Sequence, residues 1–162
     1  MILKSKKRYF LIFCAIIIAD QVAKLIIKAN VGLYEQIVVI KGFFHITQVR
    51  NTGAVWGILS GHPNPVVSLV ITGLSIAALV VVFCFFLKLE SHCVFELTSF
   101  SFIIGGALGN LIDRVTRGYV IDFIDMFIKK HHWPTYNVAD SFITIGVILL
   151  IISIWRGKCT QF

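Results

Sequence analysis

The sequence predicts an all-α membrane protein with four transmembrane helices, a small extracytoplasmic β-hairpin or β-cradle, and an interfacial loop. Of the 162 residues, 57% are hydrophobic and only 14% are charged, whereas a soluble domain has about 25% charged residues. The mean hydropathy is +0.88. Such a chain cannot cover a water-soluble globule with polar groups. This composition excludes a cytosolic enzyme, a secreted disulfide scaffold and a disordered protein.

Four apolar stretches come close to the roughly 20 residues that a helix needs to cross a bilayer. They are residues 9–27, 66–87, 97–112 and 138–155. The second carries no charge, the third is rich in Gly and Ala, and the fourth is charged only at Asp140. Basic residues precede the first stretch, as in a secretory signal, but its apolar run continues to Ala19. We therefore interpret it as a retained first helix of one membrane-embedded domain, residues 1–162.

The positive charges predict the orientation of the four helices. Basic residues are as numerous in the segments predicted to lie outside as in those inside, but the inner ones occupy much shorter segments. The positive-inside rule then places both termini in the cytoplasm. The net charge of +7 gathers at the ends of apolar runs, which favours contact with lipid phosphates rather than with nucleic acid.

Two outer segments follow from this topology, residues 31–65 and 118–136. The first contains two apolar runs around a Lys41-Gly42 turn, which predicts a β-hairpin. In the second, residues 123–133 mix aliphatic, aromatic and basic side chains, as an interfacial segment does. His131 and His132 lie in this segment, and we interpret them as interfacial rather than metal-binding residues.

The four cysteines predict neither a metal site nor a disulfide. They are Cys14, Cys84, Cys93 and Cys159. No two of them have the CxxC spacing of a metal site. None lies in a predicted outer loop, so we expect no disulfide framework.

Polar residues gather near the outer ends of the predicted helices, where a charge is costly and indicates function. Asp20 and Lys24 are four apart and share a helix face, typical of a structural ion pair. Asn110 and Arg114 share a face in the same way, close to Asp113. Asn51-Thr52-Gly53 is a turn signature. We expect these groups to converge in one layer near the outer interface.

Asp122 and Asp140 are the main catalytic candidates. Asp122 stands between apolar residues, which would raise its pKa, whereas Asp140 opens the fourth helix, where a carboxylate is stabilised. Asn137 as N-cap with Asp140 at the third helical position would also explain Asp140 structurally. Two carboxyls with such different surroundings can share one proton, as in aspartic proteolysis. Membrane aspartates can equally form the proton relay of a carrier.

Five sequence blocks, in order, resemble those of the lipoprotein signal peptidases, or type II signal peptidases, over essentially the whole chain. They are DQVAK at residues 20–24, NTGA at 51–54, GALGNLIDR at 106–114, GYVIDF at 118–123 and YNVADS at 136–141. The resemblance implies four transmembrane helices with a small extracytoplasmic β-cradle. It also implies an aspartic endopeptidase, without metal or organic cofactor, that cuts a prolipoprotein just before its diacylglyceryl-modified cysteine.

The resemblance further implies the site residues, the partners and the location. The catalytic pair is Asp122 and Asp140. The supporting positions are Asp20, Lys24, Asn51, Gly53, Ala54, Asn110, Asp113, Arg114, Asn137 and Ala139. The implied partners are diacylglyceryl-prolipoproteins, membrane lipid and cyclic-peptide inhibitors such as globomycin, with no nucleic acid, and a monomer is expected. The location is the bacterial cytoplasmic (inner) membrane, with the active site near the outer leaflet. A small proton-coupled carrier and a non-catalytic assembly factor stay open as alternatives.

Overall fold

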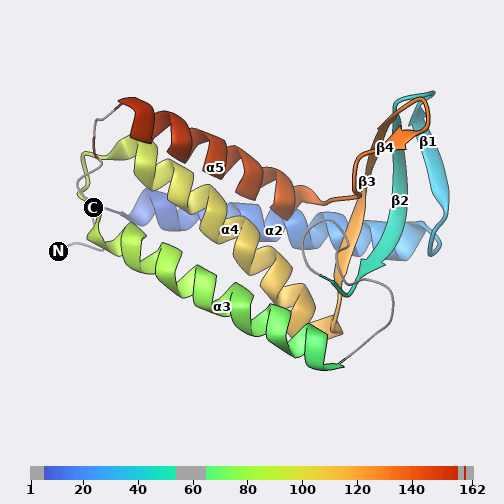
Figure 1. Ribbon diagram of the computed structural model, residues 1–162, viewed down its shortest axis with the longest axis horizontal. Helices are drawn as coiled ribbons and strands as arrows, with labels where there is room; N and C mark the ends of the chain where they lie inside the picture. The colour runs from blue at the N-terminus through green and yellow to red at the C-terminus, as the bar shows by residue number, and fades with distance from the viewer. Residues whose placement is uncertain (1–5, 54–64, 157–158, 160–162) are drawn as a thin grey trace.

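Long helices and a small sheet make up the protein in a computed structural model, which describes residues 6–53, 65–156 and 159 (Figure 1). The helices are α2 (Lys7–Asn30), α3 (Pro65–Lys88), α4 (Val94–Arg117) and α5 (Val138–Arg156). The strands are β1 (Gln36–Ile40), β2 (Phe44–Asn51), β3 (Val120–Ile128) and β4 (His131–His132). The start of α2 and the end of α5 lie at the end of the helix bundle away from the sheet.

Among the described residues, four helices are long and apolar enough to cross a membrane, as the sequence predicts. Large hydrophobic side chains on α3 and α5 stay exposed, for example Leu69 at 73% and Ile148 at 51%. In lipid such side chains need no protein cover, because the hydrocarbon is as apolar as they are. The exposed apolar faces of these two helices are therefore lipid-facing surfaces.

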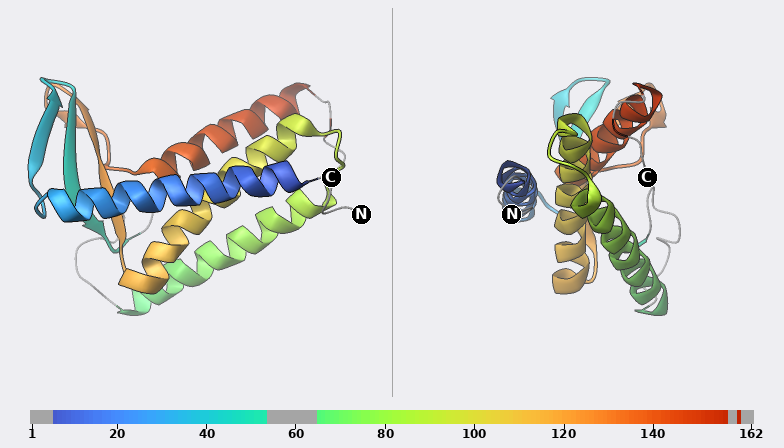
Figure 2. Two further views of the ribbon diagram at one scale, coloured as in Figure 1. Left: turned by 180° about the vertical axis from the view of Figure 1, so that it is seen from behind. Right: turned by 90° about the vertical axis from the view of Figure 1, so that its left-hand side faces the viewer.

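α4 is the central helix of the bundle and contacts each of the other three (Figure 2). Glycines on α4 allow close approach. A Cβ added at Gly106 would meet the Ala139 carbonyl of α5, and one at Gly109 would meet the Asp20 carboxylate of α2. Away from the sheet, aromatic and aliphatic side chains of α2, α3 and α4 form the apolar core: Tyr9, Phe13, Phe86, Leu97, Phe100 and Ile104.

The strands form one antiparallel sheet in the order β1-β2-β3-β4. The predicted hairpin is present as β1 and β2, and Gly42 in its turn has a positive φ of 79°, which glycine adopts readily. Residues 123–133, predicted only as an interfacial segment, lie largely in β3 and β4. The β3 sequence, VIDFIDMFI, lacks simple apolar–polar alternation because it is buried along most of its length.

The expectation that no disulfide forms is wrong for one pair. Cys93 and Cys159 are joined in a disulfide, whereas Cys14 and Cys84 are free. Cys93 directly precedes α4 and Cys159 follows α5. Because α4 and α5 pack together along their length, the two cysteines meet although they are 66 residues apart in sequence. The expectation was based on the spacing of the cysteines and on their absence from the outer loops. Neither feature predicts how α4 and α5 pack.

Candidate active site

Asp122 lies within β3, where it is only 2% exposed. Its two carboxyl oxygens accept hydrogen bonds from Asn51 Nδ2 (2.9 Å) and Asn137 Nδ2 (2.7 Å). Burial, and next the negative charge of Asp140, raise the pKa of Asp122 from 3.8 to about 7, and the two hydrogen bonds oppose this rise. At neutral pH Asp122 is therefore close to half protonated.

Asp140 lies in the first turn of α5, and its placement follows from local helix chemistry. Asn137 Oδ1 accepts a hydrogen bond from the Asp140 backbone N–H (2.9 Å), and Asp140 Oδ2 accepts one from the Asn137 backbone N–H (3.3 Å). This reciprocal pair is the capping-box arrangement, with Asn and Asp in the two positions. The predicted N-cap role of Asn137 is confirmed. The same cap holds the Asp140 carboxyl at the sheet end of the helix.

Two asparagines connect the aspartates. The Asn137 side chain donates to Asp122 Oδ1 and to Asn110 Oδ1 (3.1 Å), while Asn110 Nδ2 donates to Asp140 Oδ1 (2.7 Å). Tyr136 is bonded through its backbone to Ile124 of β3, and this contact brings the start of α5 beside Asp122. The carboxyls thus come from a strand and a helix but belong to one hydrogen-bonded network.

A buried lysine of α2 supports this network. Lys24 Nζ lies 2.7 Å from Asp20 Oδ2, 3.0 Å from Asp113 Oδ2 and 2.9 Å from Asn110 Oδ1. Lys24, Asp20 and Asp113 have no exposed side-chain surface. Asp20 also accepts the Ala139 backbone N–H (2.9 Å), so the ion cluster holds the first turn of α5 as well. The predicted Asp20–Lys24 pair is confirmed as part of a larger cluster.

The two aspartates line one cavity of about 1030 Å³. Asn51, Asn110, Arg114 and the pair itself contribute polar groups to its wall. The remainder includes apolar surface of α3, α4 and α5 and residues of β3 and of the segment 131–136. Figure 2 shows α3 and α5 diverging on the side of α4 away from α2. Arg114 is half-buried in the cavity wall and interacts electrostatically with Asp140, Asp122 and Asp113. The two aspartates and their polar neighbours therefore face a cavity that is lined in part by the membrane-spanning helices.

The remaining predicted residues fall around this centre. Gly53 is buried, and its N–H donates to Asn51 Oδ1 (2.9 Å), so the predicted turn orients the Asn51 amide toward Asp122. Ala139 is fully buried between α4 and the Asp20 carboxylate. Ala54 lies outside the described residues.

Two further residues join the cluster that sequence reasoning did not select. Gln21 Nε2 donates to Asp113 Oδ1 (3.1 Å) and to the Gly109 carbonyl (3.1 Å). Arg117 forms an ion pair with Asp113. Arg117 is four residues after Asp113 on one helix, a spacing that could have indicated this pair. Gln21 had no comparable signal, because its partners lie 88 and 92 residues away.

The fold and the site together define a membrane enzyme with paired carboxyl groups at one end of a helix bundle. Comparison with known proteins identifies its relatives. Residues 12–156 match the family described as signal peptidase (SPase) II. The chain is 40% identical to a lipoprotein signal peptidase of Geobacter metallireducens, covering 98% of both chains. It is 43% identical to one of Staphylococcus aureus, covering 96% of this chain and 95% of the relative.

The chain therefore belongs to the signal peptidase II family and is a peptidase. Two solved structures described as bacterial membrane enzymes agree with the fold. One has a TM-score of 0.83 at 38% identity, covering 96% of this chain and 92% of the other. The second has a TM-score of 0.76 at 40% identity, covering 91% of this chain and 92% of the other. These comparisons support a membrane peptidase and give no support to the carrier alternative.

Proposed function

We propose that the protein is an aspartic endopeptidase that removes the signal peptide from diacylglyceryl-modified prolipoproteins, just before the lipidated cysteine. The observation that carries the proposal is the pairing of Asp122 and Asp140. Both carboxyls belong to one network through Asn137 and Asn110, and both line the same cavity. Family membership supports the peptidase activity, and the pair supplies the groups that aspartic catalysis needs.

In the proposed mechanism the pair shares one proton and holds a water molecule between its oxygens. The pKa of Asp122, about 7, supports a proton shared by the pair at neutral pH. As the water oxygen bonds to the scissile carbonyl carbon, the ionised member of the pair takes a proton from the water. The protonated member gives its proton to the carbonyl oxygen. Collapse of the tetrahedral intermediate breaks the C–N bond, and the leaving amine takes a proton from the pair.

The shape of the cavity supports a lipidated substrate. Leu79 and Val82 of α3, Ile103 of α4 and Ile143 of α5 continue the cavity wall away from the carboxyls along the helices. Acyl chains are compatible with such an apolar wall because they lose no hydrogen bonds there. A diacylglyceryl group in this space would hold the peptide bond next to the cysteine close to the aspartates. Arg114 and Asn51 line the same cavity and would be available to hydrogen-bond that peptide.

The proposed location is the bacterial cytoplasmic membrane, with both termini in the cytoplasm and the carboxyls near the outer leaflet. The shorter segments at the end away from the sheet carry the denser positive charge, which supports this orientation. We further propose that the enzyme acts as a monomer without cofactor. A cyclic peptide such as globomycin would inhibit it by occupying the cavity beside the aspartates.

The decisive experiment compares three Asp→Asn variants on a lipidated precursor, by gel shift, with purified protein. Asp122→Asn and Asp140→Asn each lower cleavage by about 10³-fold or more, because each removes one proton-transfer group. Asp125→Asn is the matched control. Asp125 is also buried and also on β3, but it pairs with His132 and lines a different cavity. Normal cleavage by either of the first two variants contradicts the proposal, as does equal cleavage of lipidated and unlipidated precursors.

A further inference from the structure

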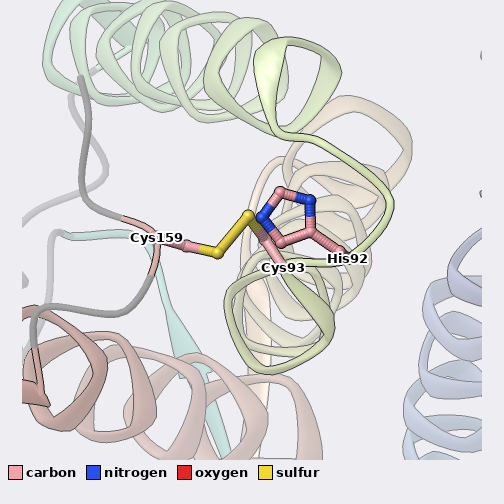
Figure 3. A group of neighbouring side chains, drawn as sticks. All are labelled: His92, Cys93 and Cys159. Carbon is pink, nitrogen blue, oxygen red and sulfur yellow. A yellow bond between two sulfur atoms is a disulfide. The ribbon is translucent and has the colours of Figure 1, made fainter.

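Three side chains with metal-binding atoms meet at the end of the helix bundle away from the sheet. His92 and Cys93 lie directly before α4, and Cys159 lies after α5. Each offers one ligand atom, and these atoms all lie within 4.8 Å of one another. Figure 3 shows the imidazole of His92 with one ring nitrogen turned toward the two sulfurs. The cluster is separate from the catalytic network, which lies at the opposite end of the same helices.

The donor set is that of a zinc-class cation. Two thiolates and one imidazole provide three of four tetrahedral positions, and the fourth stays open for water or another ligand. Glu90 Oε2 lies 3.2 Å from His92 Nδ1. A carboxylate at this position holds the proton on Nδ1 and leaves Nε2 free to bind a metal, as second-shell carboxylates do in zinc sites. The chain thus provides both the ligands and a group that orients one of them.

The oxidation state decides whether the sulfurs can bind. Cys93 and Cys159 form a disulfide here, but the proposed orientation places them on the cytoplasmic side, where thiols are kept reduced. A dithiol reductant opens the S–S bond by supplying two electrons and two protons, and itself becomes a disulfide. The two thiols then lose their protons as they bind a cation.

We propose that, in the reduced protein, His92, Cys93 and Cys159 bind a thiophilic divalent cation of the zinc class. The cation joins the segment after α5 to the turn before α4 and so holds the two helices together at this end. The cysteines lack CxxC spacing, and for that reason the sequence predicts no metal site. Helix packing supplies the proximity that the spacing does not.

Cobalt binding to the full-length protein tests the proposal. The protein is purified in detergent, reduced with a phosphine, stripped of metal with a chelator and titrated with Co²⁺. We expect one Co²⁺ per chain, with a thiolate-to-cobalt charge-transfer band and the visible bands of tetrahedral cobalt, both removed by Zn²⁺. Cys93→Ser/Cys159→Ser loses these bands, and Glu90→Gln weakens binding about tenfold.

Two controls keep the result interpretable. Cys14→Ser/Cys84→Ser removes the two free cysteines and binds Co²⁺ like the unmodified protein. Precursor cleavage by Cys93→Ser/Cys159→Ser shows that this variant is folded, because neither cysteine belongs to the catalytic network. The proposal is overturned if the reduced protein binds no Co²⁺ or if the double variant at 93 and 159 binds equally well. A disulfide that survives glutathione at cytoplasmic strength overturns it too. None of these results depends on the Asp122–Asp140 mechanism.

Discussion

The two ends of the helix bundle differ in the side chains that join α2 to the other helices. The sheet end buries an ion cluster, Asp20, Lys24 and Asp113, beside the proposed catalytic aspartates. The other end buries an aromatic cluster in which Tyr9, Phe10 and Phe13 each pack against Phe86, with ring centroids 5.8–6.5 Å apart. Polar groups are buried at this end too, since Lys6 Nζ donates to the Phe86 carbonyl (2.8 Å). Both clusters join α2 to the rest of the bundle, the first through ion pairs and the second through ring contacts.

The difference supports the proposal that catalysis takes place at the sheet end. Apolar packing requires only shape, and aromatic pairs supply it. A buried ion cluster is costly unless every member is paired, and replacing such clusters with apolar residues is often neutral for stability. The sheet end therefore contains more polar structure than helix association needs. Lys24 donates to Asn110 Oδ1, which also accepts from Asn137, and Asn110 in turn donates to Asp140. These bonds link the cost of the cluster to the positions of Asp122 and Asp140.

Removal of the buried cation should have the largest effect. Lys24→Met leaves Asp20 and Asp113 with an uncompensated buried charge, and we expect a loss of about 3–5 kcal/mol of stability. Cleavage should also fall, because the Asn110 amide oxygen loses one of its two donors and keeps only Asn137. Lys28→Met, on an exposed position of the same helix, is the matched control. Thermal unfolding and precursor cleavage by both variants provide the measurement; normal activity of Lys24→Met would separate the cluster from the site.

Asn137 allows helix capping to be distinguished from support of the catalytic pair. Asn137→Ala removes the cap, at a cost of about 1 kcal/mol, and also removes the amide that holds Asp122. We expect about a hundredfold lower kcat, as for a misplaced catalytic group. Asn137→Ser restores the cap oxygen but not the amide donors. It should therefore recover thermal stability but not kcat, and recovery of both would assign Asn137 a capping role alone.

The pH dependence tests the protonated state of Asp122. With a pKa of about 7, Asp122 loses its proton above neutrality, so kcat should fall by about tenfold per pH unit well above pH 7. The folded protein holds this proton more tightly than the unfolded chain. The free energy of unfolding should therefore decrease from about pH 4 to about pH 7 and then level off. Asp122→Asn should lack that decrease, and an unchanged profile in the variant would argue against the shifted pKa.

The aromatic end should affect stability alone. Phe100→Ala leaves a cavity in a cluster where Phe100 is only 4% exposed, and we expect a loss of a few kcal/mol. Cleavage per folded molecule should stay within about twofold of the unmodified enzyme, since packing changes rarely couple over distance. Leu74→Ala, at a position 66% exposed on α3, is the matched control and should change neither the stability nor the rate of cleavage. Reduced kcat in Phe100→Ala would show that the two ends are coupled.

The sequence by itself determined the four spans, the hairpin, the helix cap at Asn137 and the selection of Asp122 and Asp140 as candidates for the site. Each of these depends on residues close together in the chain: an uninterrupted apolar run, a turn signature, or a carboxyl at a helix start. The family resemblance added the supporting residues, most of which the structure gathers into one network.

Only the tertiary structure decided which distant groups meet. Gln21 joins the ion cluster through hydrogen bonds to residues that are 88 and 92 positions away in sequence. β3 pairs with β2 although α3 and α4 lie between them in sequence, and Cys93 forms a disulfide with Cys159. Local sequence patterns do not predict such contacts, because a contact between distant residues depends on how whole helices pack. The close approach of α2, α4 and α5 at the glycines of α4 brings Asp20, Gly109 and Ala139 together at the start of α5.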